Sequence, residues 1–237
     1  MTPDRAAMDT RDSLDGRLLP EAELIAILKK HRALWQHSGR PEDPHAILSS
    51  GLCGDGFIDV LQAIRRSGIC ALFGEQMKIA VMKRLRSSGF DGSIDWVVGS
   101  DHGSAALSHS VAISFGAQHD FTEKAADKKK QVWERLEIKP GETVLQAEEV
   151  IIQGRAAMAV REGVRKGNRS PVTFAPVIAT LLHQSNLRYL DGVPIVWLVH
   201  VDINVWDPAE CPLCAAGSQR VNPRTNWTEL AGPGPWL

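Results

Sequence analysis

The residues best suited to chemistry are Glu148 and Glu149, which follow the apolar run "VLQA" and precede the loop "VIIQGRA". Adjacent carboxylates accept hydrogen bonds from sugar hydroxyls. Gly154 then precedes a helical pattern, and a glycine turn at a helix N-terminus directs backbone N–H groups at an anion. The arrangement suits a ribose phosphate. An acidic pair alone would also fit a strand end at which two glutamates are simply capped or solvated.

A second polar loop, "GSDHGSA", covers residues 99–105. Its glycines, Gly99 and Gly103, allow the backbone to approach an anion closely. Asp101 would repel such an anion unless Mg²⁺ bridged the two. We expect His109 and His119 to be packing or surface residues and not ligands.

The four cysteines include one C-x₂-C pair, Cys211 and Cys214. This pair supplies half of a four-ligand zinc site, and Cys53, Cys70, His183 or His200 would complete it only if the fold brought them close. We therefore keep Cys211 and Cys214 as a candidate half-site and do not expect zinc as a cofactor.

The elements that must position these residues alternate in type. Short apolar runs at 94–100 and 143–151 predict strands, helical patterns at 104–117 and 155–167 follow them, and further apolar runs cover 172–184 and 193–206. This alternation predicts an α/β fold with a mostly parallel central sheet flanked by helices. Ligands of such sheets bind at the carboxyl ends of the strands, where both polar loops would lie.

The remaining sequence predicts a helix over 19–36, a glycine-rich turn over 51–56 and a helix over 68–89 that stops at Gly89. We expect a flexible N-terminus at 1–18, a single domain at 19–217 and a C-terminal tail at 218–237.

Composition excludes several classes of function. The formal net charge of −1 gives no overall basic field for nucleic acid. No apolar run reaches the roughly 18 residues of a membrane span, and the first residues are too charged for a signal sequence. We expect a cytoplasmic protein whose partners include neither nucleic acid nor a membrane.

The frame from Val144 to Ala156 resembles the acidic motif and phosphate loop of the type I phosphoribosyltransferases. Orotate phosphoribosyltransferases are the most similar members, because three further stretches match in order. "SSGLCGDGFID" resembles the turn beside the base, "VVGSDHGSAALSHSVAISFGA" the pyrophosphate loop with its strand and helix, and "DPAECPLCAAG" a C-terminal stretch of some bacterial members.

The resemblance implies the family fold, with an N-terminal helix and a small hood. It implies transfer of a phosphoribosyl group from phosphoribosyl pyrophosphate to a small nitrogen heterocycle, with Mg²⁺ near Glu148 and Glu149, in a homodimer. These two glutamates and Lys124 would be catalytic, and Cys53 and Phe57 would contact the base. The residues expected around the ribose phosphate and pyrophosphate are Ser100, Asp101, His102, Gly103, Glu148, Glu149, Gln153, Gly154 and Arg155.

The phosphate loop departs from the family pattern, because Ile152, Gln153 and Ala156 stand where hydroxyl residues are usual. Each lost hydrogen bond to a phosphate is worth about 1.5–3 kcal/mol, and the Arg155 guanidinium is a candidate replacement. The departure motivates an alternative hypothesis: a divergent member that binds a nucleotide or sugar phosphate as a regulator, or performs hydrolase or lyase chemistry. The acceptor stays open, since Cys53 and Gly54 replace the usual His and Ser.

Overall fold

The computed structural model describes residues 16–101, 103–126 and 130–232. The expected flexible segment 1–18 therefore lies almost wholly outside the described residues. The chain divides into two units, each with its own internal contacts. The first comprises residues 1–21 and 64–201, and the second comprises residues 22–63 and 202–237.

The first unit is built on a six-stranded sheet with the order β11-β12-β10-β9-β5-β6. Every neighbouring pair is parallel except β11 with β12, so the predicted α/β fold with a mostly parallel sheet is confirmed. Two short strands, β7 and β8, form a separate antiparallel pair. The strands of this unit are β5 (Trp96–Gly99), β6 (Gln118–Phe121), β7 (Glu123–Lys124), β8 (Gln131–Val132), β9 (Thr143–Ile151), β10 (Thr173–His183), β11 (Tyr189–Leu190) and β12 (Val193–His200).

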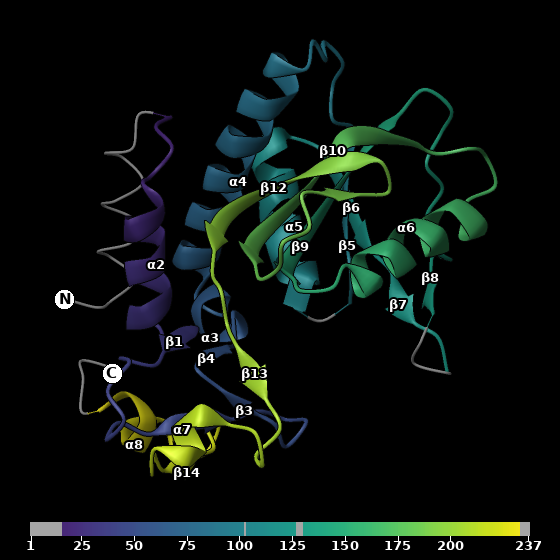
Figure 1. Cartoon of the computed structure of the whole chain (residues 1–237). Coiled ribbons are helices and arrows are strands. Elements are labelled where there is room, and N and C mark those ends of the chain that lie inside the picture. Colours follow the sequence, from purple (N-terminus) through teal and green to yellow (C-terminus); the bar gives the residue numbers. More distant parts are fainter. Residues whose placement is uncertain (1–15, 102, 127–129, 233–237) are drawn as a thin grey trace. The chain divides into compact units, whose positions relative to one another are not determined.

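Helices cover both faces of this sheet. α4 (Ser67–Ser87) and α5 (Gly103–Phe115) pack together on one face, and α6 (Arg155–Gly167) lies on the other (Figure 1). The approach of α4 to α5 requires Gly74, where a Cβ would lie 2.8 Å from the Ser110 backbone. On the opposite face, α6 supplies apolar side chains to a core cluster, which contains Trp96, Val98, Trp133, Ile138, Val144, Val160 and Val164.

Several predicted boundaries agree with the structure. Strand β9 and helix α6 have the expected bounds, and α4 ends just before Gly89, whose φ of +74° suits a residue without a side chain. The Phe90 N–H then donates to the Leu85 carbonyl, which caps the helix end. No helix among the described residues is both long and apolar enough to cross a membrane.

The second unit is assembled from two distant parts of the chain. Its four-stranded sheet has the order β13-β3-β2-β14, and β1 pairs with β4 in a separate hairpin-like ribbon. Its elements are α2 (Glu21–Lys30), which starts at the unit boundary, β1 (Leu34–Gln36), β2 (His45–Ile47), β3 (Cys53–Gly54), β4 (Gly56–Ile58), α3 (Leu61–Ile64), β13 (Val205–Trp206), α7 (Pro212–Ala215), β14 (Arg220–Val221) and α8 (Trp227–Ala231).

The helix predicted over 19–36 is too long. Helix α2 ends at Lys30, Arg32 takes a left-handed φ of +59°, and Leu34 begins strand β1 opposite Ile58. Pairing with a strand more than twenty residues away outweighed the local helical pattern, as tertiary contacts commonly outweigh propensity.

Residues expected as a C-terminal tail belong partly to this second unit. Strand β14 runs parallel to β2, and α8 places Trp227 and Leu230 in an apolar cluster with Trp35 and Phe57. The Trp227 ring meets the Phe57 ring edge-on at 6.3 Å between centroids. The burial of these side chains orders residues 220–231 within the second unit.

Candidate functional site

The site lies at the carboxyl edge of the six-stranded sheet, within the first unit. Strand β5 ends at Gly99 and its neighbour β9 ends at Ile151, so the loops that follow them emerge side by side. Helix α5 starts so close to the acidic pair that a Cβ on Gly103 would lie 2.6 Å from Glu149 Oε1. The structure thus brings together the two polar loops that the sequence predicted at one edge of the sheet.

Glu148 is buried, with 2 % of its surface exposed, and both of its oxygens have partners. The Ser100 and Ser104 hydroxyls lie 2.9 and 2.7 Å from Oε2, and Gln146 Nε2 donates to Oε1 over 2.7 Å. Burial raises the pKa of this carboxyl, and the three hydrogen bonds oppose that rise. Glu148 is therefore held rigidly inside the sheet edge.

Glu149 is half-buried and shares the Ser104 hydroxyl with Glu148. Burial, followed by the neighbouring charge of Glu148, raises the pKa of Glu149 to about 7. Four close contacts join the Ser100 and Ser104 hydroxyls to each other and to the two carboxylates. The two hydroxyls carry only two protons, so they can donate in only two of these contacts. A proton on one carboxyl would make that carboxyl the donor in a third contact, which agrees with the raised pKa of both glutamates.

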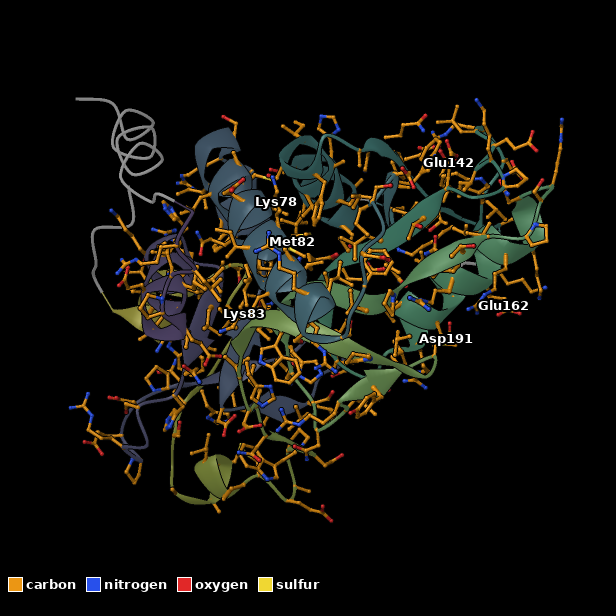
Figure 2. All side chains as sticks on the ribbon, turned by 90° about the horizontal axis from the view of Figure 1, so that it is seen from above. Lys78, Met82, Lys83, Glu142, Glu162 and Asp191 are labelled. Carbon is orange, nitrogen blue, oxygen red and sulfur yellow. The ribbon has the colours of Figure 1, made fainter. Side chains whose placement is uncertain are left out.

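The buried Arg161 is linked by hydrogen bonds through Gln146 to the acidic pair. Arg161 Nε donates to Gln146 Oε1 over 3.0 Å, and Gln146 in turn donates to Glu148. Arg161 Nη1 also contacts Asp191 Oδ2 at 2.7 Å, and Asp191, labelled in Figure 2, pairs with Arg165 as well. The sequence contained a signal for this residue, since Arg161 falls in the stripe of buried α6 positions that otherwise reads Ala157, Val160 and Val164.

The phosphate loop ends at Gly154, whose φ of +71° places it in the left-handed region as the N-cap of α6. No side chain caps the helix there, so its first N–H groups depend on other partners. The Arg155 guanidinium donates to the Gln153 side-chain oxygen, and Ile152 is 48 % exposed. Gln153, Gly154 and Arg155 thus lie together at a helix N-terminus that is free of capping hydroxyls.

Lys124 Nζ lies 3.4 Å from Asp101 Oδ2, and both residues line an open depression together with Phe121. The lysine side chain is half exposed while Asp101 is buried, so the charge of Asp101 is balanced from the solvent side. His102 and residues 127–129 lie outside the described residues. His119 accepts or donates a hydrogen bond with Ser108 at 2.8 Å and packs against His109.

The two expected base contacts lie in the second unit. Cys53 is completely buried and its thiol faces Cys214 at 3.6 Å, which leaves it no open surface for a base. Phe57 lines a pocket of this unit with Arg32, Asp59, Gln62, Pro223, Arg224 and Trp227.

Cys211 and Cys214 belong to a cluster of four side chains that could bind a metal ion. They lie with Cys53 and His45, and the four ligand atoms are within 4.8 Å of one another. Of the partners considered from the sequence, Cys53 is present, whereas Cys70, His183 and His200 belong to the first unit. His45 was missed because nothing in the sequence relates it to a cysteine pair 166 residues away.

No family model matches the chain. Among curated proteins, it is 28% identical over 192 residues to the orotate phosphoribosyltransferase of Acidithiobacillus ferrooxidans, covering 81% of this chain and 93% of that protein. It is 23% identical over 199 residues to the enzyme of the same name from Nitratiruptor sp., covering 80% and 95%.

Solved structures share the fold. The orotate phosphoribosyltransferase of Mycobacterium tuberculosis H37Rv superposes with a TM-score of 0.55 at 19% identity, covering 76% of this chain and 96% of that one. The UMP synthase of Leishmania donovani gives 0.52 at 14% identity over 77% of this chain and 37% of that one. The resemblance drawn from the sequence is confirmed: the curated relatives are orotate phosphoribosyltransferases, and the chain has the phosphoribosyltransferase fold.

Proposed function

We propose that this chain, as a relative of the orotate phosphoribosyltransferases with their fold, transfers a phosphoribosyl group from phosphoribosyl pyrophosphate to a nitrogen heterocycle. The observation that carries the proposal is the buried acidic strand end beside a glycine-capped helix N-terminus. Carboxylates there suit ribose hydroxyls and helix N–H groups suit the 5′-phosphate. Only Glu149 is partly open to solvent, so it would accept the hydroxyls, while Glu148 would fix its position.

In the proposed reaction the C1–pyrophosphate bond breaks as the heterocycle nitrogen bonds to C1. Positive charge then develops on the sugar and negative charge on the departing pyrophosphate. Lys124 would stabilise the pyrophosphate, since its ammonium is half exposed at the open depression beside Asp101. Mg²⁺ would add charge stabilisation when bound; beside the buried Glu148, the carboxylates of Asp101 and Glu149 offer the oxygen ligands that it prefers.

The altered phosphate loop can still hold a phosphate in this proposal. Backbone N–H groups at the start of α6 replace part of the lost hydrogen bonding, and Arg155 adds a guanidinium that can contact two phosphate oxygens. Phe57 remains our proposed base contact, because it lines a pocket of the second unit; Cys53 is withdrawn from that role. A homodimer and a cytoplasmic location complete the proposal, to be tested by light scattering and by cell fractionation.

Titration calorimetry with phosphoribosyl pyrophosphate and Mg²⁺ tests the binding step. We expect saturable binding, weakened at least tenfold by Glu149→Ala and unchanged by the exposed control Glu134→Ala. An absence of heat at millimolar ligand would overturn the proposal. Binding without turnover on any heterocycle would point to a regulator that uses the same site.

A further inference from the structure

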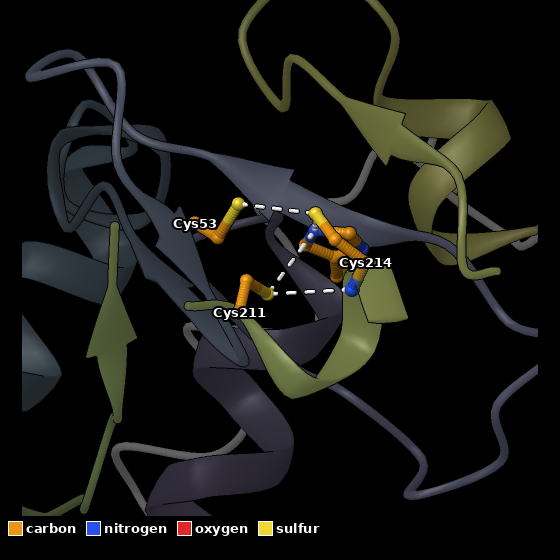
Figure 3. Close-up of side chains that lie close together, drawn as sticks. Cys53, Cys211 and Cys214 are labelled. Carbon is orange, nitrogen blue, oxygen red and sulfur yellow. Dashed lines mark hydrogen bonds between the residues drawn. The ribbon is translucent and has the colours of Figure 1, made fainter. Parts of the chain in front are cut away.

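Four metal-ligating side chains converge within the second unit. His45 lies on β2 and Cys53 on β3. Cys211 is the N-cap of α7, and Cys214 lies within that helix. Figure 3 shows the sulfur atoms of the three cysteines turned toward one another. Three of the four residues are buried and Cys214 is partly buried, so water has little access to the cluster.

Three of the six distances between the ligand atoms match the edges of a tetrahedron around one zinc ion, and all six are within 4.8 Å. With Zn–S distances of about 2.3 Å and Zn–N distances of about 2.0–2.1 Å, the edges of a tetrahedron are about 3.8 Å between sulfurs and about 3.5 Å from sulfur to nitrogen. Here Cys53 Sγ lies 3.6 Å from Cys214 Sγ. His45 Nε2 lies 3.4 Å from Cys214 Sγ and 3.7 Å from Cys211 Sγ.

The surroundings prepare His45 as a ligand. The Ser218 hydroxyl donates to the Asp43 carbonyl over 2.6 Å, so its oxygen is left to accept from His45 Nδ1 at 2.8 Å. The proton therefore belongs on Nδ1, and the lone pair of Nε2 faces the cysteines. Such an outer hydrogen bond, which fixes the tautomer, is typical of zinc-bound histidines.

The cysteine pair has the local geometry of a zinc-binding turn. The Cys214 N–H donates to Cys211 Sγ over 3.5 Å, because Cys211 is the N-cap of the short helix α7 and Cys214 lies in its first turn. N–H groups directed at sulfur stabilise thiolate, which is the form that binds metal.

We propose that His45, Cys53, Cys211 and Cys214 bind one structural zinc ion. All four protein positions of a tetrahedral site are filled, so the ion has no open position for substrate and serves stability. Its ligands come equally from the two chain segments of the second unit, 22–63 and 202–237, which the ion joins. A small unit with a limited apolar core gains most from such a link.

The test measures metal in the full chain, purified without chelator and with any histidine tag removed. Mass spectrometry should find one zinc per chain. His45→Ala and Cys214→Ser should lower that ratio at least tenfold, whereas Cys70→Ser, which removes a buried cysteine of the first unit, should leave it unchanged. Zinc retained by both cluster variants would overturn the proposal.

A second measurement needs no variant, and so does not depend on whether the substituted chains fold. X-ray absorption at the zinc edge of the unaltered protein should show three sulfur ligands at about 2.3 Å and one nitrogen at about 2.0 Å. A shell of oxygen and nitrogen only, an iron–sulfur spectrum, a metal-free chain after zinc supplementation, or a disulfide between Cys53 and Cys214 would each contradict the assignment.

Discussion

Among single residues, Glu149 has the ionisation on which the proposed binding of phosphoribosyl pyrophosphate depends most. Its pKa of about 7 means that the carboxylate form, which accepts hydrogen bonds from ribose hydroxyls, grows as pH rises through neutrality. We predict that the KM for phosphoribosyl pyrophosphate falls between pH ~6 and pH ~8. Steady-state kinetics across this range checks the prediction. Glu149→Gln should flatten the profile, and a wild-type KM that rises with pH would contradict the assigned role.

Arg155 is the residue on which the altered phosphate loop depends. If its guanidinium replaces hydroxyls that are usual in the family, Arg155→Ala should weaken phosphoribosyl pyrophosphate binding by about 10- to 100-fold, the equivalent of about 1.5–3 kcal/mol. Calorimetry measures this change. Arg169→Ala, which removes an equally exposed arginine beyond the far end of α6, is the matched control. Equal affinities for both variants would assign the phosphate to backbone groups alone.

Helix α6 contributes through its buried face as well as its N-terminus. Arg161 links Asp191 to Gln146 and so to Glu148, and its loss would leave the buried side-chain oxygen of Gln146 without the donor Arg161 Nε. We predict that Arg161→Met lowers the free energy of unfolding by roughly 3 kcal/mol, as for a broken buried ion pair. Urea denaturation provides the measurement.

Arg165 supplies the matched control for this helix. It pairs with the same Asp191, but its side chain is 45% exposed, so Arg165→Met should cost less than about 1 kcal/mol. If both substitutions lower the free energy of unfolding equally, the buried hydrogen bonds from Asp191 through Arg161 and Gln146 to Glu148 stabilise the fold no more than the exposed ion pair does.

At the scale of the whole molecule, the second unit joins two segments that are far apart in the chain. Removal of zinc should loosen this unit and lower its melting temperature by roughly 10 °C, which corresponds to about 3 kcal/mol for a chain of this size. Calorimetry with and without a chelator checks this expectation. If the chelator lowered the melting temperature of Cys214→Ser as much as that of the unaltered chain, the cause would be something other than loss of this zinc ion.

The sequence predicted those parts of the fold that depend on local pattern. Strand β9 and helix α6 follow from an apolar run and a helical period, and Gly154 between them follows from the turn. The local pattern predicts helix where β1 forms, because the pairing of β1 with β4 is a contact between distant segments. The same limit hid Ser104 as the shared partner of both glutamates, and His45 as the fourth ligand of the cysteine cluster.

Pyrophosphate release is the direct measure of the proposed phosphoribosyl transfer. The full chain is incubated with phosphoribosyl pyrophosphate, Mg²⁺ and a panel of nitrogen heterocycles that includes orotate, and pyrophosphate and nucleotide are quantified by phosphorus NMR. We predict both products in equal amounts with at least one heterocycle, and their loss in Glu149→Ala. Neither product with any heterocycle, or undiminished product from Glu149→Ala, would contradict this prediction.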